Sequence, residues 1–341
     1  MLFPFPAVFK RVRDSCGKGF REVDEIWRAG NDVMTTNLTK PMSKKLLFAI
    51  ILVTIGAEVL LYLTRYSTMA NTLYDAVMVS SFFIGWKLYR RLGSPHDHPK
   101  TKRQHALQFT GAFLLFFLGS MVINVFSTMT LEDFNTDYDH YVQNYTSVQT
   151  YMGTDDDDGA HPAKPIWSFF EKVDTIGYDL YTDTLAGLEE VWRLGYIILL
   201  LVIFKKVFPR RWESGRRDIF LMTALFLTSI IFGIDHTLDK EQPWSIKMGA
   251  IVTFANMGFL FGLLLLWTRN LWVIVLVHAL YDITATLSWY YVDYAVELFA
   301  LVVLLIHVIL FSFEKSNQRR LSRESGMIEL VQAPEIIHNV E

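Results

Sequence analysis

Three stretches of this sequence place ionisable side chains inside segments that are otherwise apolar. In chain order, the stretches contain Glu189-Glu190 with Arg193, then Asp235-His236, then His278 with Asp282. An ionisable residue near the centre of a membrane-spanning helix costs about 2.5–3.5 kcal/mol on insertion scales, so it persists where it is paired or needed. The presence of all three stretches in one chain therefore favours a constructed site.

The residue types in these stretches could together hydrolyse a peptide bond. A glutamate in a site with little water, such as Glu189, can act as a general base and take a proton from a water molecule. Two imidazoles opposite it, His236 and His278, can hold the substrate carbonyl and stabilise the oxyanion as it forms. The same three residue types can also ligate zinc, although the chain has no His-Glu-x-x-His helix. A serine mechanism lacks support, because no serine has the sequence context of a nucleophile.

Each stretch also has a purely structural interpretation. Glu190 and Arg193 are three residues apart and can form an intrahelical ion pair that offsets its own burial. His236 can be an interfacial histidine at a helix end. His278 and Asp282, four apart on one helix face, can make a structural hydrogen bond between helices. Glu189 has no obvious local partner, and this favours a catalytic interpretation of the set.

The apolar residues are gathered into long blocks, and this arrangement predicts the fold class. Hydrophobic residues make up 52% of the 341 residues, and a helix needs about 20 mostly apolar residues to cross the hydrocarbon core of a bilayer. The blocks are too long for barrel strands and lack their alternation. We therefore expect an all-α, polytopic membrane protein with about eight transmembrane helices. The expected spans are 46–64, 72–89, 107–129, 182–204, 218–236, 247–267, 271–291 and 294–313.

The distribution of basic residues predicts the orientation of these spans. Of the 32 lysines and arginines, 26 fall in the two ends of the chain and in alternate connections, whereas five fall in the other connections. Basic residues accumulate on the cytoplasmic side of a membrane. The sequence therefore predicts an integral, multi-pass protein, located in the cell (inner) membrane, with both termini cytoplasmic.

The expected spans divide the chain into five regions. Residues 1–45 form a cytoplasmic N-terminal arm, 46–129 three transmembrane helices, 130–181 an acidic extracytoplasmic loop, 182–313 a core of five transmembrane helices with the site, and 314–341 a cytoplasmic tail. The four aspartates at 155–158 favour a solvated acidic loop over a calcium loop, because Pro165 stands where a calcium loop needs glutamate. The net charge of -3 excludes a generally basic nucleic-acid-binding protein.

The order and spacing of the three stretches resemble a known family. A di-glutamate in one span, Phe-x-x-x-His in the next and His-x-x-x-Asn/Asp two spans later are similar to the CAAX protease and bacteriocin-processing family of intramembrane glutamic endopeptidases. In this chain the matching residues are Glu189-Glu190, Phe232 with His236, and His278 with Asp282, preceded by Gly258-Phe259-Leu260-Phe261-Gly262 and Trp267-Thr268-Arg269-Asn270-Leu271-Trp272. The resemblance covers about 180–290.

The resemblance implies a role for each of these residues. It implies that Glu189 is the base that activates water and that Glu190 supports it. It implies that His236 and His278 are ligands of the substrate or the oxyanion. Asp282 takes a place that asparagine usually holds in the family.

Phe232 and Arg193 are implied as supporting residues, and the arginine departs from the family pattern. The family has arginine five residues after the first glutamate, where this chain has Leu194, and Arg193 comes one residue earlier. A shift of one residue turns a helical side chain by about 100°.

The resemblance implies a hydrolase, an intramembrane endopeptidase that cleaves a membrane-associated protein or peptide at the lipid bilayer and uses no cofactor, with zinc as the alternative. Two other functions stay open. A catalytically weakened relative could act as a membrane regulator or immunity-type protein, and the displaced arginine would distinguish it. A proton-coupled transporter could use Glu189, Glu190 and Asp282 as a relay.

The basic-residue distribution yields a topology that reporter fusions can test. A fusion after Asp158 is expected to report the extracytoplasmic side, and a fusion after Glu341 the cytoplasmic side, because a 26-to-5 split is too uneven for one substitution to reverse. Reports from the same side for both fusions would mean that the expected number of spans is wrong by one.

Overall fold

The structure is a computed structural model, and it describes residues 30–93, 101–130, 136, 165–215, 217–238 and 241–332. Much of the expected N-terminal arm, most of the expected acidic loop with its aspartate run, and the end of the tail lie outside the described residues. Within the described part every regular element is a helix, in agreement with the predicted all-α class.

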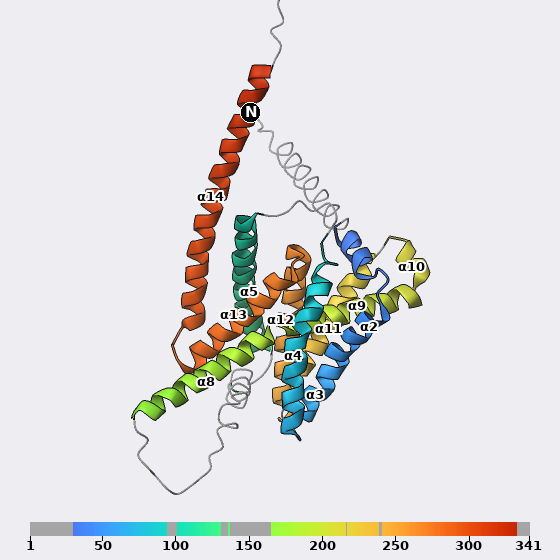
Figure 1. Ribbon diagram of the computed structural model, residues 1–341, viewed down its shortest axis with the longest axis vertical. Helices are drawn as coiled ribbons and strands as arrows, with labels where there is room; N and C mark the ends of the chain where they lie inside the picture. Colours follow the sequence, from blue (N-terminus) through green and yellow to red (C-terminus); the bar gives the residue numbers. More distant parts are fainter. Residues whose placement is uncertain are drawn as a thin grey trace, which may run out of the picture.

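The helices follow one another with short connections (Figure 1). Residues 30–38 are helical and precede the first labelled helix. The labelled elements are α2 (Lys44–Ile51), the π-helical turn η1 (Leu52–Gly56), α3 (Ala57–Leu63), α4 (Thr68–Tyr89), α5 (Lys102–Thr130), α8 (Pro165–Ala186), α9 (Glu189–Val207), α10 (Pro209–Glu213), α11 (Arg217–Asp235), α12 (Trp244–Thr268), α13 (Leu271–Tyr290) and α14 (Ala295–Gln332).

Six of the described helical segments are long and apolar enough to cross a membrane. They are Lys44–Leu63, Lys102–Thr130, Arg217–Asp235, Trp244–Thr268, Leu271–Tyr290 and Ala295–Asn317. α4 and α9 match two further expected spans in position, but they do not qualify by length and composition, and α9 carries Glu189, Glu190 and Arg193 near its start. The chain is thus a polytopic helical membrane protein, and the expected count of eight spans is not confirmed.

α8 begins within the last part of the region for which the sequence predicted a loop. It runs from Pro165 to Ala186, so it overlaps both the expected loop, 130–181, and the start of the expected span 182–204. α8 packs along α13, and Figure 1 shows it crossing the lower end of the bundle. The turn at Gly187 then leads into α9, which begins with the two glutamates of the predicted site.

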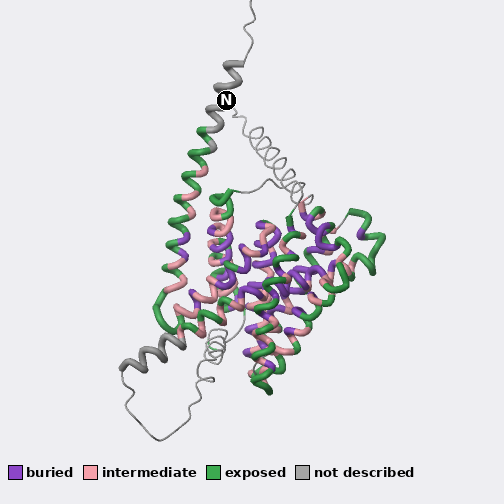
Figure 2. The backbone as a smooth tube through the Cα atoms, viewed as in Figure 1, coloured by how far each residue is buried: buried purple, intermediate pink, exposed green. Residues whose placement is uncertain are grey.

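The buried core lies where α9, α11, α12 and α13 meet, and α14 is largely exposed over the part whose side chains are described (Figure 2). α11 and α12 form the most extensive helix pair, because small residues let their backbones approach closely. A Cβ atom on Gly233 would lie 2.3 Å from the carbonyl oxygen of Ile251. α11 therefore depends on glycine at this position, directly after Phe232.

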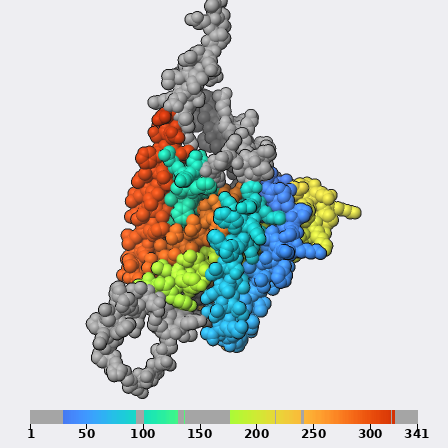
Figure 3. Space-filling model, in the orientation of Figure 1, coloured from blue at the N-terminus to red at the C-terminus, as the bar shows by residue number. Residues whose placement is uncertain are grey.

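The N-terminal helices cover one side of this core. α2, α3 and α4 lie together on the face seen in Figure 3. Gly195 of α9 allows close contact with the π-helical turn, since a Cβ atom there would lie 2.9 Å from Cγ2 of Thr54. Arg65, after α3, donates to the carbonyl oxygens of Thr237 and Leu238 at the end of α11. These contacts hold the first membrane helix against α9 and α11.

The close approach of α11 and α12 can be tested with one substitution. Gly233→Ala is expected to destabilise the protein by about 1–3 kcal/mol, because the added methyl group overpacks the contact with Ile251. The measurement is the thermal unfolding midpoint in one fixed detergent. Gly177→Ala in α8 is the matched control, because nothing lies within 4 Å of its added Cβ atom; alanine should be neutral or slightly stabilising there. Equal midpoints for the two variants would contradict the close approach.

Candidate functional site

The first turn of α9 holds a buried ion pair. Glu190 and Arg193 are 1% and 3% exposed and bind each other through Oε2 and Nη2. Their spacing of three residues places both side chains on one face of the helix. Arg193 also donates through Nη1 to the carbonyl oxygen of Gly258 in α12. The expected intrahelical pair is present, and the arginine links α9 to α12.

His278 of α13 lies between two carboxylates. Its Nδ1 is 3.3 Å from Oε1 of Glu190, and its Nε2 is 3.2 Å from Oδ2 of Asp282, one turn further along α13. Among the described residues neither Nδ1 of His278 nor Oε1 of Glu190 has a hydrogen bond with good geometry. The contact between these two atoms is therefore electrostatic. Glu190, Arg193, His278 and Asp282 therefore form one connected network across α9 and α13.

His236 directly follows α11, and contacts with Phe232 and Phe254 orient its ring. Its Nδ1 lies 2.7 Å from the carbonyl oxygen of Phe232, one turn earlier. A carbonyl oxygen only accepts, so Nδ1 must carry the proton of this hydrogen bond. The ring also stacks on Phe254 of α12, with 3.9 Å between ring centroids. In the neutral ring Nε2 is then an acceptor.

Phe232 joins the two histidines. Its ring centroid lies 4.6 Å from that of His236 and 5.8 Å from that of His278. The guanidinium of Arg193 lies 5.6 Å from the centre of the same ring. Gly258 provides the space for this packing, because a Cβ atom there would lie 2.9 Å from the Phe232 ring. The expected supporting residues, Phe232 and Arg193, thus occupy the middle of the site.

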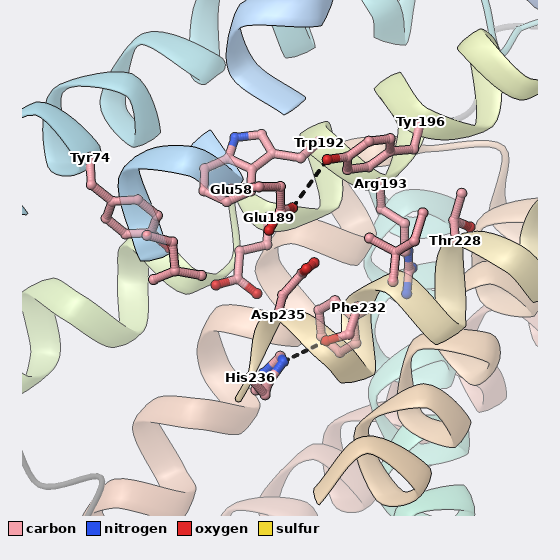
Figure 4. Close-up of a pocket in the computed structure, with 12 residues that line it drawn as sticks. Glu58, Tyr74, Glu189, Trp192, Arg193, Tyr196, Thr228, Phe232, Asp235 and His236 are labelled. Atoms are coloured by element: carbon pink, nitrogen blue, oxygen red, sulfur yellow. Dashed lines mark hydrogen bonds between the residues drawn. The ribbon is translucent and has the colours of Figure 1, made fainter. Parts of the chain in front are cut away.

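A pocket opens beside this network (Figure 4). It contains Glu189 and His236 of the expected site, whereas Glu190, His278 and Asp282 do not line it. Glu190 and His278 are buried behind the pocket wall. The lining residues are Glu58, Leu61, Tyr74, Glu189, Trp192, Arg193, Tyr196, Thr228, Ile231, Phe232, Asp235 and His236.

The lining includes ionisable residues to which the sequence analysis gave no role. Figure 4 shows the carboxyl groups of Glu58, Glu189 and Asp235 turned toward the same space, with Tyr196 beside Glu58. A signal for Glu58 was present, because it is the one ionisable residue between 46 and 64 and the insertion cost argument applies to it equally. Asp235 stood next to His236 in the second stretch but received no role.

The arrangement of donors bears on the zinc alternative. Across the described ranges, no group of three or more histidine, cysteine, aspartate and glutamate side chains is placed to hold a metal ion. Glu189 and His236 share a pocket, but His278 has carboxylate oxygens near both ring nitrogens. The donors of the expected His, His, Glu set therefore do not converge on one point.

Comparison with protein-family models gives a match. Residues 186–284 match a family model described as type II CAAX prenyl endopeptidase Rce1-like. No curated protein and no solved structure matches the chain. The matched segment begins at the last residue of α8, runs through α9, α11 and α12, and ends within α13, so it holds both the ion-pair network and the two histidines. Residues 186–284 of this polytopic membrane protein are therefore similar to the Rce1-like CAAX protease family.

Proposed function

We propose that this chain is an intramembrane endopeptidase that hydrolyses a peptide bond of a membrane-associated protein or peptide. The observation that carries the proposal is that Glu189 and His236 line one pocket, within a domain that matches an endopeptidase family. A general base and a second polar group on the same side of a cavity are what the activation of a water molecule requires.

Glu189 and His236 hold and activate the attacking water. Because Nδ1 of His236 donates to the Phe232 carbonyl, Nε2 of the neutral ring accepts a hydrogen bond from that water. Glu189 takes one proton from the same water, and the oxygen bonds to the carbonyl carbon of the substrate. When the carbon–nitrogen bond breaks, the protonated Glu189 returns this proton to the leaving nitrogen. This assigns His236 to the water rather than to the oxyanion.

The network behind the pocket supplies positive charge to the reaction. His278 has carboxylate oxygens near both ring nitrogens, and negative charge on either side of the ring favours its imidazolium form. Positive charge that is already in place stabilises the oxyanion at no cost of reorganisation. Asp282 orients His278, and Glu190 and Arg193 hold the first turn of α9, from which Glu189 extends.

We further propose that both termini lie in the cytoplasm and that the protein is located in the cell (inner) membrane. This orientation rests on the 26-to-5 distribution of basic residues. The partners of the protein are then the lipid bilayer and a substrate that reaches the pocket from it, and no nucleic acid is among them.

A second candidate function is a weakened relative that binds a membrane partner without cleaving it. The observation that favours it is the position of Arg193, one residue before the place of the family's arginine. In this chain Arg193 nevertheless binds Glu190 and the Gly258 carbonyl through its two Nη atoms and lies against the Phe232 ring. This engagement supports the peptidase over the weakened relative.

Glu189→Gln is expected to reduce peptide cleavage by about 10²-fold or more, because glutamine keeps the volume but cannot accept the proton. The measurement is cleavage of a peptide library by the full chain in liposomes. Glu213→Gln, which removes an exposed carboxylate of α10, is the matched control and should cleave like the wild type. Near-normal cleavage by Glu189→Gln would refute its role as the base, and no cleavage by the wild type would favour the partner-binding function.

Cleavage is expected to survive thorough chelation, because the proposed water is activated by Glu189 and His236 and not by a metal ion. A zinc enzyme would lose the ion that activates its water and would stop. The measurement compares initial cleavage rates before and after dialysis against a chelator, followed by addition of zinc. A loss on dialysis that zinc restores would replace the glutamate mechanism by the zinc alternative.

A further inference from the structure

A carboxyl pair connects the first membrane helix to the pocket. Glu58 of α3 and Asp235 of α11 have side chains within hydrogen-bonding distance of each other. Figure 4 shows both carboxyl groups facing the space that Glu189 also faces. Glu58 lies outside the matched segment, 186–284. The matched domain therefore does not form this part of the pocket by itself.

The hydrogen bonding of Glu58 is incomplete without a proton. Its Oε1 accepts from the hydroxyl of Tyr196, at 3.3 Å. Its Oε2 is buried and, within the described residues, has no donor. Two ionised carboxylates repel each other and cannot hydrogen-bond, whereas one shared proton supplies the missing donor. A buried acceptor without a donor is costly, so a protonated pair is the better arrangement.

The pair is held together by contacts on both sides. Arg65 binds the carbonyl oxygens of Thr237 and Leu238, which come shortly after Asp235 in the chain. Gly195 lets the π-helical turn that precedes Glu58 approach α9. These contacts hold in place the backbone segments from which the two carboxyl groups extend.

We infer that Glu58 and Asp235 share one proton and that this pair is a positioning element that limits the negative charge beside Glu189. The effect of the pair on catalysis rests on the proposed function, because negative charge matters most where an oxyanion forms. A second negative charge on the pair would oppose that oxyanion and disturb Glu189, since charges interact strongly in a site with little water. The other titratable or charged groups that line the pocket around the pair are Tyr74 of α4, Glu189, Arg193 and Tyr196 of α9, and His236 after α11.

Infrared difference spectroscopy of the full chain in liposomes tests the shared proton without any substrate. Glu58→Gln and Asp235→Asn are each expected to remove the C=O stretch of one protonated carboxyl group, and the double variant should remove no more than either alone. Glu213→Gln is the control and should leave this band unchanged. The inference would be overturned if only one of the single variants lost the C=O band, or if neither lost it. It would also be overturned if the double variant lost two bands.

The pH dependence of cleavage tests the consequence of the pair. Glu58→Ala is expected to cleave about tenfold more slowly, the effect of one lost buried hydrogen bond, and Glu58→Gln should recover part of this loss because its amide imitates the protonated acid. The wild-type rate should fall toward alkaline pH as the pair loses its proton, and Glu58→Gln should lack that step. Superimposable profiles would overturn the inference while leaving the peptidase intact. A wild type that cleaves nothing refutes the proposed function, and the infrared comparison then still decides whether the proton is shared.

Discussion

The burial of one ion pair determines how the central helices of this protein are arranged. Glu190 and Arg193 are almost completely removed from solvent, and a buried charge without partners costs several kcal/mol. Arg193 binds Glu190 and the Gly258 carbonyl of α12, and Glu190 also faces His278 of α13. α9 can therefore occupy this position only with α12 and α13 on its two sides.

Close packing of these helices brings the residues of the site together. Lipid offers no hydrophobic driving force for helices to associate, so small residues that allow close approach become important. Gly233 brings α11 against α12, and Gly258 makes room for the ring of Phe232. Phe232 in turn touches both histidines. The packing that satisfies the ion pair is thus also the packing that places His236 and His278 near each other.

The pocket extends beyond the segment that matches the protease family. Glu58, Leu61 and Tyr74 line it from α3 and α4, which precede residue 186. Arg65 and the π-helical turn hold these helices in place. A π-helical turn adds a residue to a helix turn and redirects the side chains that follow, and Glu58 lies in the first turn of α3, just after it. The N-terminal helices therefore belong to the site and are not merely its covering.

The sequence by itself determined the helical class, the approximate bounds of most helices and the ionisable residues worth examining. These are local properties: apolar length predicts a span, and a spacing of three or four residues predicts that Glu190 meets Arg193 and that His278 meets Asp282. The tertiary structure alone decided that Glu189 and His236 share a pocket while Glu190 and His278 lie behind it. It also decided that Glu58 faces Asp235 and that α8 forms where a loop was expected. These features depend on the rotation and close approach of helices far apart in the chain, which packing between backbones and side chains determines and which no periodicity within one helix encodes.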